Sequence, residues 1–218
     1  MKLRLEIVYS TPNGIETFLH SSDLTVEEVI TISEDMMNLN RVKEIKYIDS
    51  YDSAWTLKDL KKYVKDLEEE PHDIMLYFDG GFDHETLQSG LGCVIYYKQN
   101  GISYRIRKNA LVSELETNNE AEYAALHFGL KHLEEMGVHH MPITIKGDSK
   151  VVINQLTDEW PCLEETLSQW IDRIEESLAI LGTVPIYQVV SRKNNQEADQ
   201  LATQALQNIE ITSKIELA

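Results

Sequence analysis

The residues best suited to chemistry in this 218-residue chain are four carboxylates, Asp79, Glu122, Asp148 and Asp199. Each is predicted to lie where a strand ends or a helix begins, inside a short polar motif that a solvated surface charge would not need. Four carboxylates gathered in one cleft would repel one another strongly unless divalent cations neutralised them. Their types and positions therefore predict a metal-dependent reaction.

Asp79 and Asp148 share one arrangement, an aspartate at the end of an apolar strand. Asp79 follows the apolar run 74–78 and precedes two glycines, while Asp148 follows the strand 143–146. Ligands of α/β proteins gather at the carboxyl ends of strands, and glycines let a phosphate or another backbone approach closely. The alternative for Asp79 is an aspartate that only forms a turn. If both residues end strands, Asp79 and Asp148 could lie on neighbouring strands.

Helix periodicity separates the two glutamates of the motif 117–123. Thr117 and Glu120 have the spacing of a capping box, which predicts a structural role and an exposed position for Glu120. Glu122 instead heads the apolar stripe of the helix 117–136, in line with leucines four, eight and eleven residues later. A buried carboxylate without a partner is costly, so we expect a metal ion or a donor network to meet Glu122.

Asp199 lies near the start of the last predicted helix, 195–209. Asn194 and Glu197 resemble a second capping box, whereas Asp199 is in line with Ala202, Thr203 and Leu206, toward the packed side. The alternative is an aspartate that only complements the helix dipole.

The elements that must position these carboxylates begin at residue 74. The apolar and polar periodicities predict strands at 74–78, 92–98, 103–108, 143–146 and 184–190, and helices at 117–136, 151–156, 163–181 and 195–209. The segment 99–101, Gln-Asn-Gly, is a hairpin signal. Three meandering strands followed by alternating helices and strands predict an α/β domain, a mixed sheet with helices packed on it.

The first seventy residues form a unit of their own. They predict a hairpin of strands 3–9 and 15–20, a helix from Thr25, a strand at 42–49 and a helix at 56–69. We therefore expect a small α+β accessory domain at residues 1–70, a linker at 71–73, and the domain carrying the carboxylates at 74–218.

Composition limits the remaining classes of function. No apolar run is long enough for a membrane span and the N-terminus does not have the form of a secretory signal, so we expect a cytoplasmic protein without a membrane partner. Neither the two cysteines nor the histidines have a metal-ligand spacing. The net charge of −17 argues against a broadly basic nucleic-acid-binding surface, but a cleft that acts through metal ions needs only a local one.

The four motifs, in this order, resemble those of the type 1 ribonuclease H family, over about residues 73–207. The resemblance rests on Asp79-Gly80, on Thr-Asn-Asn-x-x-Glu at 117–122, on Asp148-Ser149, and on Asn-x-x-x-Asp at 195–199. It implies a ribonuclease H-like fold, a five-stranded mixed sheet flanked by helices with its first three strands antiparallel. The glutamate of the family's motif matches Glu122, in agreement with the helix periodicity.

The resemblance further implies an endonuclease, a hydrolase that cleaves the RNA strand of an RNA–DNA hybrid with two Mg²⁺ or Mn²⁺ ions bound together with the substrate. Asp79 would bridge the ions, Glu122 and Asp148 would ligate one, and Asp199 would complete the other. The residues expected to contact the substrate are Gly80, Gly81, Asn118, Asn119, Ser149, Lys150 and Asn195.

Departures from the family pattern bear on activity. The stretch 189–195 lacks the histidine that well-known bacterial members carry, and Arg192 takes the position of an arginine found in an archaeal-like branch, so we expect it to act in catalysis. The basic protrusion of some members is absent, since 161–181 is acidic, which predicts weak hybrid affinity.

Three questions stay open on the sequence. A catalytically weak or inactive scaffold that binds nucleic acid or protein is one alternative, and a nuclease acting on plain RNA or on junctions is another. Residues 1–70 could bind a protein partner or mediate self-association.

Overall fold

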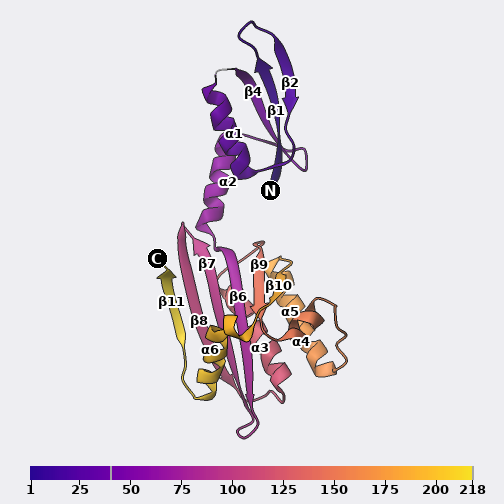
Figure 1. Ribbon diagram of the computed structural model, residues 1–218, viewed down its shortest axis with the longest axis vertical. Helices are drawn as coiled ribbons and strands as arrows, with labels where there is room; N and C mark the ends of the chain where they lie inside the picture. The colour runs from indigo at the N-terminus through magenta and orange to yellow at the C-terminus, as the bar shows by residue number, and fades with distance from the viewer. Residues whose placement is uncertain (40, 218) are drawn as a thin grey trace. The chain divides into compact units, whose positions relative to one another are not determined.

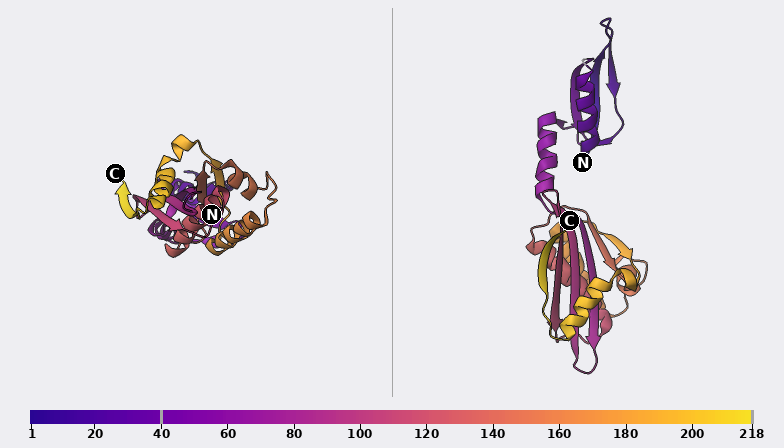
Figure 2. Two further views of the ribbon diagram at one scale, coloured as in Figure 1. Left: turned by 90° about the horizontal axis from the view of Figure 1, so that it is seen from below. Right: turned by 60° about the vertical axis from the view of Figure 1, so that its left-hand side comes forward.

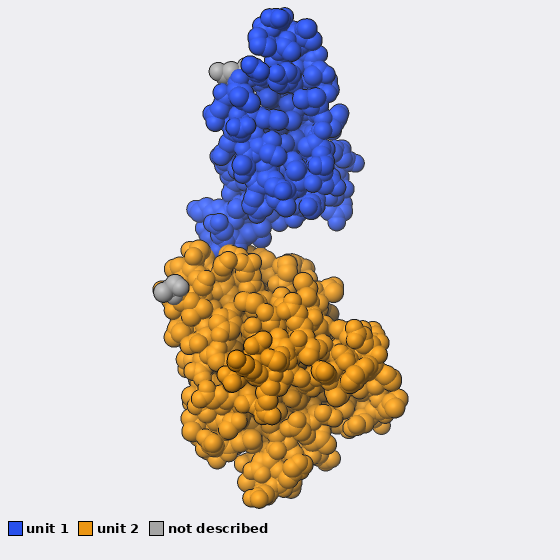
Figure 3. Space-filling view, viewed as in Figure 1, with its two compact units in different colours: residues 1–69 blue, residues 70–218 orange. Residues whose placement is uncertain are grey.

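The computed structural model describes residues 1–39 and 41–217, and the chain divides into two compact units, Met1–Glu69 and Glu70–Ala218 (Figure 3). No helix within the described residues is long and apolar enough to cross a membrane. Each unit has its own sheet, and the four carboxylates all belong to unit 2.

Unit 1 is a small α+β fold in which two helices accompany one antiparallel sheet (Figure 1). Its strands are β1 (Lys2–Ser10), β2 (Glu16–His20), β3 (Leu24–Thr25), β4 (Val42–Asp49) and β5 (Ala54–Trp55), and its helices are α1 (Val26–Asn38) and α2 (Leu57–Glu69). The predicted hairpin, helices and third long strand are therefore confirmed. The two-residue strands β3 and β5 are too short to leave a periodic pattern in the sequence.

Alternation and capping explain why unit 1 folds this way. Leu3, Leu5 and Ile7 are buried on one face of β1, where they form a core with Val29 of α1 and Leu60 of α2. Thr25 and Glu28 make the predicted capping box at the start of α1, because each side chain accepts from the other residue's backbone N–H.

Unit 2 contains a six-stranded mixed sheet in the order β10-β9-β6-β7-β8-β11. Its strands are β6 (His72–Asp83), β7 (Gln88–Gln99), β8 (Ile102–Val112), β9 (Ile143–Gly147), β10 (Ile186–Val189) and β11 (Thr212–Leu217). β6, β7 and β8 form an antiparallel meander, and β9 and β10 add in parallel beside β6. The five strands of the expected ribonuclease H-like sheet are thus present in the expected arrangement.

The sixth strand, β11, was not anticipated from the sequence. It pairs antiparallel with β8 at the edge of the sheet, and its residues are mostly exposed, so it lacks the apolar run that marks a buried strand. Asn109 of β8 fixes the chain at the start of β11, because its backbone N–H donates to Ile211 O (3.1 Å) and its Oδ1 accepts from Ile211 N (2.7 Å).

The expected linker at 71–73 is corrected by the structure, since His72 and Asp73 already belong to β6. Asp73 has a left-handed φ of 53° and the pairing of β6 with β7 shifts register between His72 and Met75, so the strand begins with an irregularity. The Asp73 carboxylate accepts from Lys98 Nζ on β7 at 2.8 Å, which holds this irregular start on the sheet.

The helices of unit 2 cover both faces of the sheet. They are α3 (Asn118–Glu135), α4 (Lys150–Leu156), α5 (Glu165–Leu181) and α6 (Gln196–Leu206), preceded by the 3₁₀ turn η1 (Arg192–Asn194). Figures 1 and 2 show α6 crossing one face of the sheet, with α3 and α5 on the other.

Glycines on the strands set how closely these helices approach. A Cβ on Gly80 would lie 2.2 Å from the carbonyl of Ala121 on α3, and a Cβ on Gly90 would lie 2.1 Å from the carbonyl oxygen of Ala202 on α6. Only the absence of side chains at these positions allows such contact between helix and strand backbones. The beginning of α3 and the second half of α6 are thereby held against the sheet.

Candidate active site

A cavity of about 240 Å³ in unit 2 brings the four carboxylates together. They come from four separate elements: Asp79 from β6, Glu122 from α3, Asp148 from the end of β9 and Asp199 from α6. The other residues that line the cavity are Gly80, Gly81, Asn118, Arg192, Ala202, Thr203 and Leu206. Residues separated by more than a hundred positions thus meet at one site.

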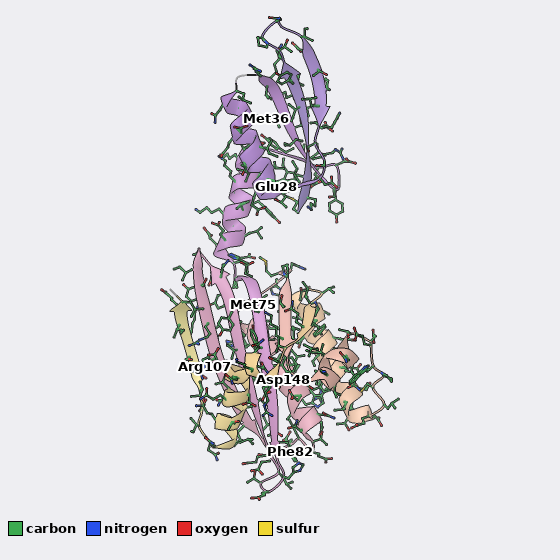
Figure 4. The ribbon with its side chains drawn as sticks, viewed as in Figure 1. Glu28, Met36, Met75, Phe82, Arg107 and Asp148 are labelled. Carbon is green, nitrogen blue, oxygen red and sulfur yellow. The ribbon has the colours of Figure 1, made fainter. Side chains whose placement is uncertain are left out.

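The parallel pairing of β6 and β9 explains why Asp79 and Asp148 are neighbours. The last pair in this register is Tyr77 with Lys146, and each aspartate follows two residues later. Asp148 lies just past the end of β9 (Figure 4). Both side chains therefore reach the open space beyond the end of β9, as expected at the carboxyl end of a parallel strand.

The expectation that Asp79 ends its strand is wrong. β6 continues to Asp83, because its antiparallel pairing with β7 runs on through Asp79, opposite Gly92. Beyond Tyr77, β6 therefore loses its neighbour β9 but keeps its neighbour β7. Asp79 is held rigidly by β7 while its side chain, 8% exposed, faces the cavity.

Glu122 heads the buried side of α3, as its helical position predicts. It is 8% exposed, and its Oε2 accepts a long hydrogen bond of 3.3 Å from the Gly80 backbone N–H. Thr117 caps the helix by accepting from Glu120 N.

The predicted exposed position of Glu120 is wrong, since this side chain is only 7% exposed. Its carboxylate accepts from Glu116 N at 2.9 Å and from the Thr117 hydroxyl at 3.5 Å, rather than from the Thr117 backbone N–H, so it turns back over the loop that enters α3. Glu120 keeps a structural role and does not line the carboxylate cavity.

Asn195 is the internal donor of the site. Its Nδ2 donates to Phe78 O at 2.9 Å and to Asp148 Oδ1 at 2.7 Å, and it lies 3.5 Å from Asp79 Oδ1. The residue is 1% exposed, so its position favours a structural role over the expected contact with substrate. It instead joins η1 and α6 to the strands that carry two of the carboxylates.

The capping box expected from Asn194 and Glu197 is also wrong. Asn194 belongs to η1, and the N-cap residue of α6 is Asn195, which makes no side-chain cap bond. The Glu197 carboxylate accepts instead from Tyr96 Oη on β7 and from Arg105 Nη1 on β8, the latter at 2.7 Å. These contacts tie the first turn of α6 to the sheet.

Arg192 is the cationic side chain of the site. It is exposed on η1, and its Nη2 lies 2.7 Å from Asp199 Oδ1. The pKa of Arg192 is raised, chiefly by its hydrogen bond to Asp199 and by the charge of that carboxylate. The arginine seven residues before Asp199 therefore faces the carboxylates, as the sequence suggested.

Burial and repulsion perturb two of the carboxylates strongly. The pKa of Asp79 is raised to about 8, first by desolvation and then by the charges of Asp148 and Asp199. The pKa of Glu122 is raised to about 9, first by desolvation and then by the charges of Asp79 and Asp148. The site thus holds more negative charge than its own donors neutralise.

The predicted substrate-contacting residues divide into two groups. Gly80, Gly81 and Asn118 line the cavity, whereas Asn119, Ser149 and Lys150 do not. Ser149 serves as the N-cap of α4, where its Oγ accepts from Val152 N at 3.4 Å.

The lining residues of α6 beyond Asp199 were not assigned to the site from the sequence. Ala202, Thr203 and Leu206 follow Asp199 by three, four and seven residues, so they share its side of the helix. That spacing predicts a position toward the packed core, but at this end of the sheet the same side of α6 also borders the cavity.

The donor set suits a hard divalent cation. Carboxylate oxygens are the ligands that Mg²⁺ and Mn²⁺ prefer, and the raised pKa values of Asp79 and Glu122 mark a deficit of positive charge. Among the described residues, no three Asp, Glu, His or Cys side chains enclose an ion as they stand. Instead, Asn195 donates a hydrogen bond to Asp148, and Arg192 forms an ion pair with Asp199.

Comparison with known proteins agrees with this architecture. The reverse transcriptase-like family matches residues 77–205. An uncharacterized protein of Bacillus subtilis, YpeP, is 41% identical over the whole of this chain and 96% of its own length. A ribonuclease HI of Halobacterium salinarum is 32% identical over 130 residues, which are 60% of this chain and 62% of that protein.

A solved structure extends the agreement to three dimensions. LC11-RNase H1, isolated from compost by a metagenomic approach and solved in complex with an RNA/DNA hybrid, matches with a TM-score of 0.55 and 26% identity. The match covers 62% of this chain and 98% of that one. The predicted ribonuclease H-like fold and family are therefore confirmed, and the chain belongs to the reverse transcriptase-like family of ribonuclease H-like proteins.

Proposed function

We propose that this protein is a metal-dependent endonuclease that hydrolyses the RNA strand of RNA–DNA hybrids. The observation that carries the proposal is the meeting of four carboxylates from four elements in one cavity of a ribonuclease H-like fold. The hybrid bound to the similar LC11-RNase H1 supports the same substrate class here.

Asp79 is the central ligand of the proposed site. Its charge contributes to the raised pKa of Glu122, and the charges of Asp148 and Asp199 contribute to its own, so it lies among all three other carboxylates. Asp79, Glu122, Asp148 and Asp199 would hold two Mg²⁺ or Mn²⁺ ions. When bound, such ions activate water and stabilise the leaving oxygen of a phosphodiester.

Asn195 and Arg192 prepare the site without being ligands. The Asn195 amide restrains Asp148 and Asp79 through donated hydrogen bonds, which fixes the orientation of two carboxylates before substrate arrives. The Arg192 side chain is 79% exposed, so it would leave Asp199 to contact a phosphate or the cleaved product.

Asn118 is the best placed residue to read the hybrid. It is exposed at the cavity, and its Oδ1 accepts from Phe82 N at 3.3 Å, which leaves the amide NH₂ free to donate outward. In a hybrid's minor groove, the 2′-hydroxyl is the acceptor that distinguishes RNA from DNA.

A catalytically weak scaffold is the second candidate, favoured by the charge of the molecule. The net charge is −17, and the acidic residues of α5 and its N-cap are exposed: Glu164, Glu165, Asp172, Glu175 and Glu176. No basic protrusion grips a hybrid in this segment. Affinity for the polyanion then depends on the metal site and on a few local cations.

The deciding experiment compares four substrates of one sequence at low ionic strength. Purified protein is incubated with an RNA–DNA hybrid, duplex RNA, single-stranded RNA and duplex DNA, each in Mg²⁺, in Mn²⁺ and in EDTA. We expect cleavage of the hybrid's RNA strand alone, and only with a divalent cation. Binding without cleavage would favour the scaffold, and cleavage of plain RNA would redirect the proposal to another substrate.

A further inference from the structure

The outer strand of the unit 1 sheet has an open edge. Within the described residues, β2 pairs with β1 on one side only, and all five of its residues are exposed. Its register with β1 has no bulge and the strand contains neither lysine nor proline, which are common means of protecting an edge. Phe18 is 68% exposed in the middle of this strand.

Two hydrogen bonds show which residues of the strand turn their backbone toward β1. Thr11 N–H donates to Ile15 O at 2.8 Å, and Ser21 N–H donates to Leu5 O at 3.0 Å. In an antiparallel pair, alternate residues direct N–H and C=O to the same side, so all odd-numbered residues of this segment bond to β1. The residues that direct their N–H and C=O groups to the open edge are Glu16, Phe18 and His20.

The side chains of these three residues also share one face of the sheet. Phe18 lies opposite Val8, whereas the neighbouring Ile7 is buried in the core with the helices. Glu16, Phe18 and His20 therefore face away from that core, because successive side chains of a strand alternate between faces. The edge thus presents an aromatic ring between an acidic and an imidazole side chain.

We propose that β2 pairs antiparallel with β2 of a second copy of this chain, centred on Phe18. That register exchanges backbone hydrogen bonds between the two Phe18 residues and places Glu16 of each copy opposite His20 of the other. An aromatic pair and a carboxylate that accepts from an imidazole N–H are cross-strand contacts that stabilise a sheet, and this sequence supplies both around one twofold axis. The self-complementary order of Glu16, Phe18 and His20 is what favours a second copy over an unrelated strand.

A shift of the register would lose this complementarity. Moving the second strand by two residues would pair Phe18 with Glu16 or His20 and leave the aromatic ring without its counterpart. Lys43 of the same unit forms an ion pair with Glu16, at one end of the proposed pairing. Electrostatic and apolar contacts therefore agree on the register centred on Phe18.

Mass and amide exchange of the full-length chain test the proposal together. Light scattering after size exclusion, over about 5–200 µM protein, is expected to give twice the mass of one chain at the upper end. Hydrogen exchange should slow at the amides of Glu16, Phe18 and His20 as the concentration rises. The amides of Thr17 and Leu19, already bonded to β1, should not change. A single-chain mass throughout this range would overturn the proposal.

Substitutions at the edge separate this interface from any other. Phe18→Lys places two like charges at the twofold axis and should give the mass of one chain, while thermal unfolding stays cooperative. The matched control is Met37→Lys, an exposed apolar residue of α1, which should remain a dimer. A dimer that survives Phe18→Lys would show that the copies associate elsewhere.

A charge exchange tests the register itself. His20→Glu sets Glu16 opposite a glutamate and should weaken the dimer at least about tenfold, whereas Glu16→Lys combined with His20→Glu sets opposite charges at these positions and should recover it. Failure of the double variant to dimerise, with its fold intact by circular dichroism, would rule out the pairing of positions 16 and 20.

Discussion

At the scale of residues, the site is a balance between four carboxylates and two side-chain donors. Asn195 supplies the only side-chain amide that donates to the carboxylates among the described contacts, and Arg192 supplies the cation. Desolvation and mutual repulsion leave Asp79 and Glu122 with pKa values raised to about 8 and about 9. Bound divalent cations would relieve this repulsion.

Removal of the Asn195 amide should destabilise the protein. In Asn195→Ala, Phe78 O and Asp148 lose their buried donor, which should lower the free energy of unfolding by about 1–3 kcal/mol. Asn194→Ala, at the exposed neighbouring position, should change it by less than about 0.5 kcal/mol. Urea denaturation of both variants measures the difference, and equal stabilities would contradict the donor role.

The raised pKa values predict a specific pH dependence of stability without metal. Asp79 and Glu122 bind protons in the folded state up to about pH 8 and 9, whereas unfolded carboxyls titrate near pH 4. Between these limits the folded state binds more protons, so the free energy of unfolding falls as pH rises.

Asp79→Asn isolates this effect from other titrating groups. The substitution removes one carboxyl with a raised pKa, and it removes a negative charge next to Glu122. In EDTA, the Tm of the variant should therefore increase relative to that of the wild type as pH increases from 5 to 9. Saturating Mg²⁺ should narrow the gap by stabilising only the wild type. Parallel Tm curves at all pH values would refute the predicted titration.

At the scale of elements, close contact between helices and strands brings the carboxylates together. Gly80 lets the beginning of α3 lie against β6, and glycines of β7 do the same for α6. These contacts hold the helices that carry Glu122 and Asp199 against opposite faces of the sheet. The precision of the site is therefore built into the sheet and not into loops.

Gly80→Ala tests this role of close packing. Its Cβ would lie 2.2 Å from Ala121 backbone atoms, so α3 must shift, which should cost about 1–3 kcal/mol and lower any hybrid cleavage. In Gly81→Ala, the nearest atom is Leu206 Cδ1 at 3.4 Å, and stability should change by less than about 1 kcal/mol. Chemical denaturation that ranks Gly81→Ala as the more damaging variant would contradict the packing argument.

The sequence predicts these elements well where their patterns are local. Apolar periodicity locates the long strands and helices, and helix position correctly assigns Glu122 rather than Glu120 to the carboxylate cavity, although both are buried. The predictions are wrong where tertiary contacts determine the end of a strand, the partner of a side chain or the formation of an edge strand. β7 extends β6 beyond Asp79, Tyr96 and Arg105 draw Glu197 away from a cap, and β8 recruits the polar segment that forms β11.

The burial of Asn195 could not be predicted from the sequence alone, because it depends on the fold. Its sequence position, four residues before Asp199, matches a surface residue of a helix start equally well. Only the meeting of η1 with β6 and β9 turns its amide inward to Phe78 and Asp148.

At the scale of the whole molecule, chemistry and self-association are assigned to different units. Every residue lining the carboxylate cavity belongs to unit 2, and every residue of the proposed dimer edge belongs to unit 1. Two catalytic units in one dimer would raise the apparent affinity for a long hybrid by multivalency. That gain would offset the acidic surface of the molecule.

Deletion of residues 1–69 should separate these properties. The remaining unit 2 has its own sheet and helices, so it should fold and cleave a short hybrid at a rate within about threefold of the full chain. It should be a single chain in solution and bind a long hybrid more weakly. Loss of all cleavage by a folded unit 2 would instead assign unit 1 a part in the chemistry.

The central claim is that the four carboxylates form a metal-dependent nuclease site, and single-turnover cleavage of a labelled RNA–DNA hybrid in Mg²⁺ tests it most directly. The wild type and the control Asp172→Asn, an exposed aspartate of α5, should cleave the RNA strand at similar rates. Asp79→Asn should be slower by at least about 100-fold, because it removes the carboxylate that lies among the other three. Cleavage by Asp79→Asn at the wild-type rate would contradict the account.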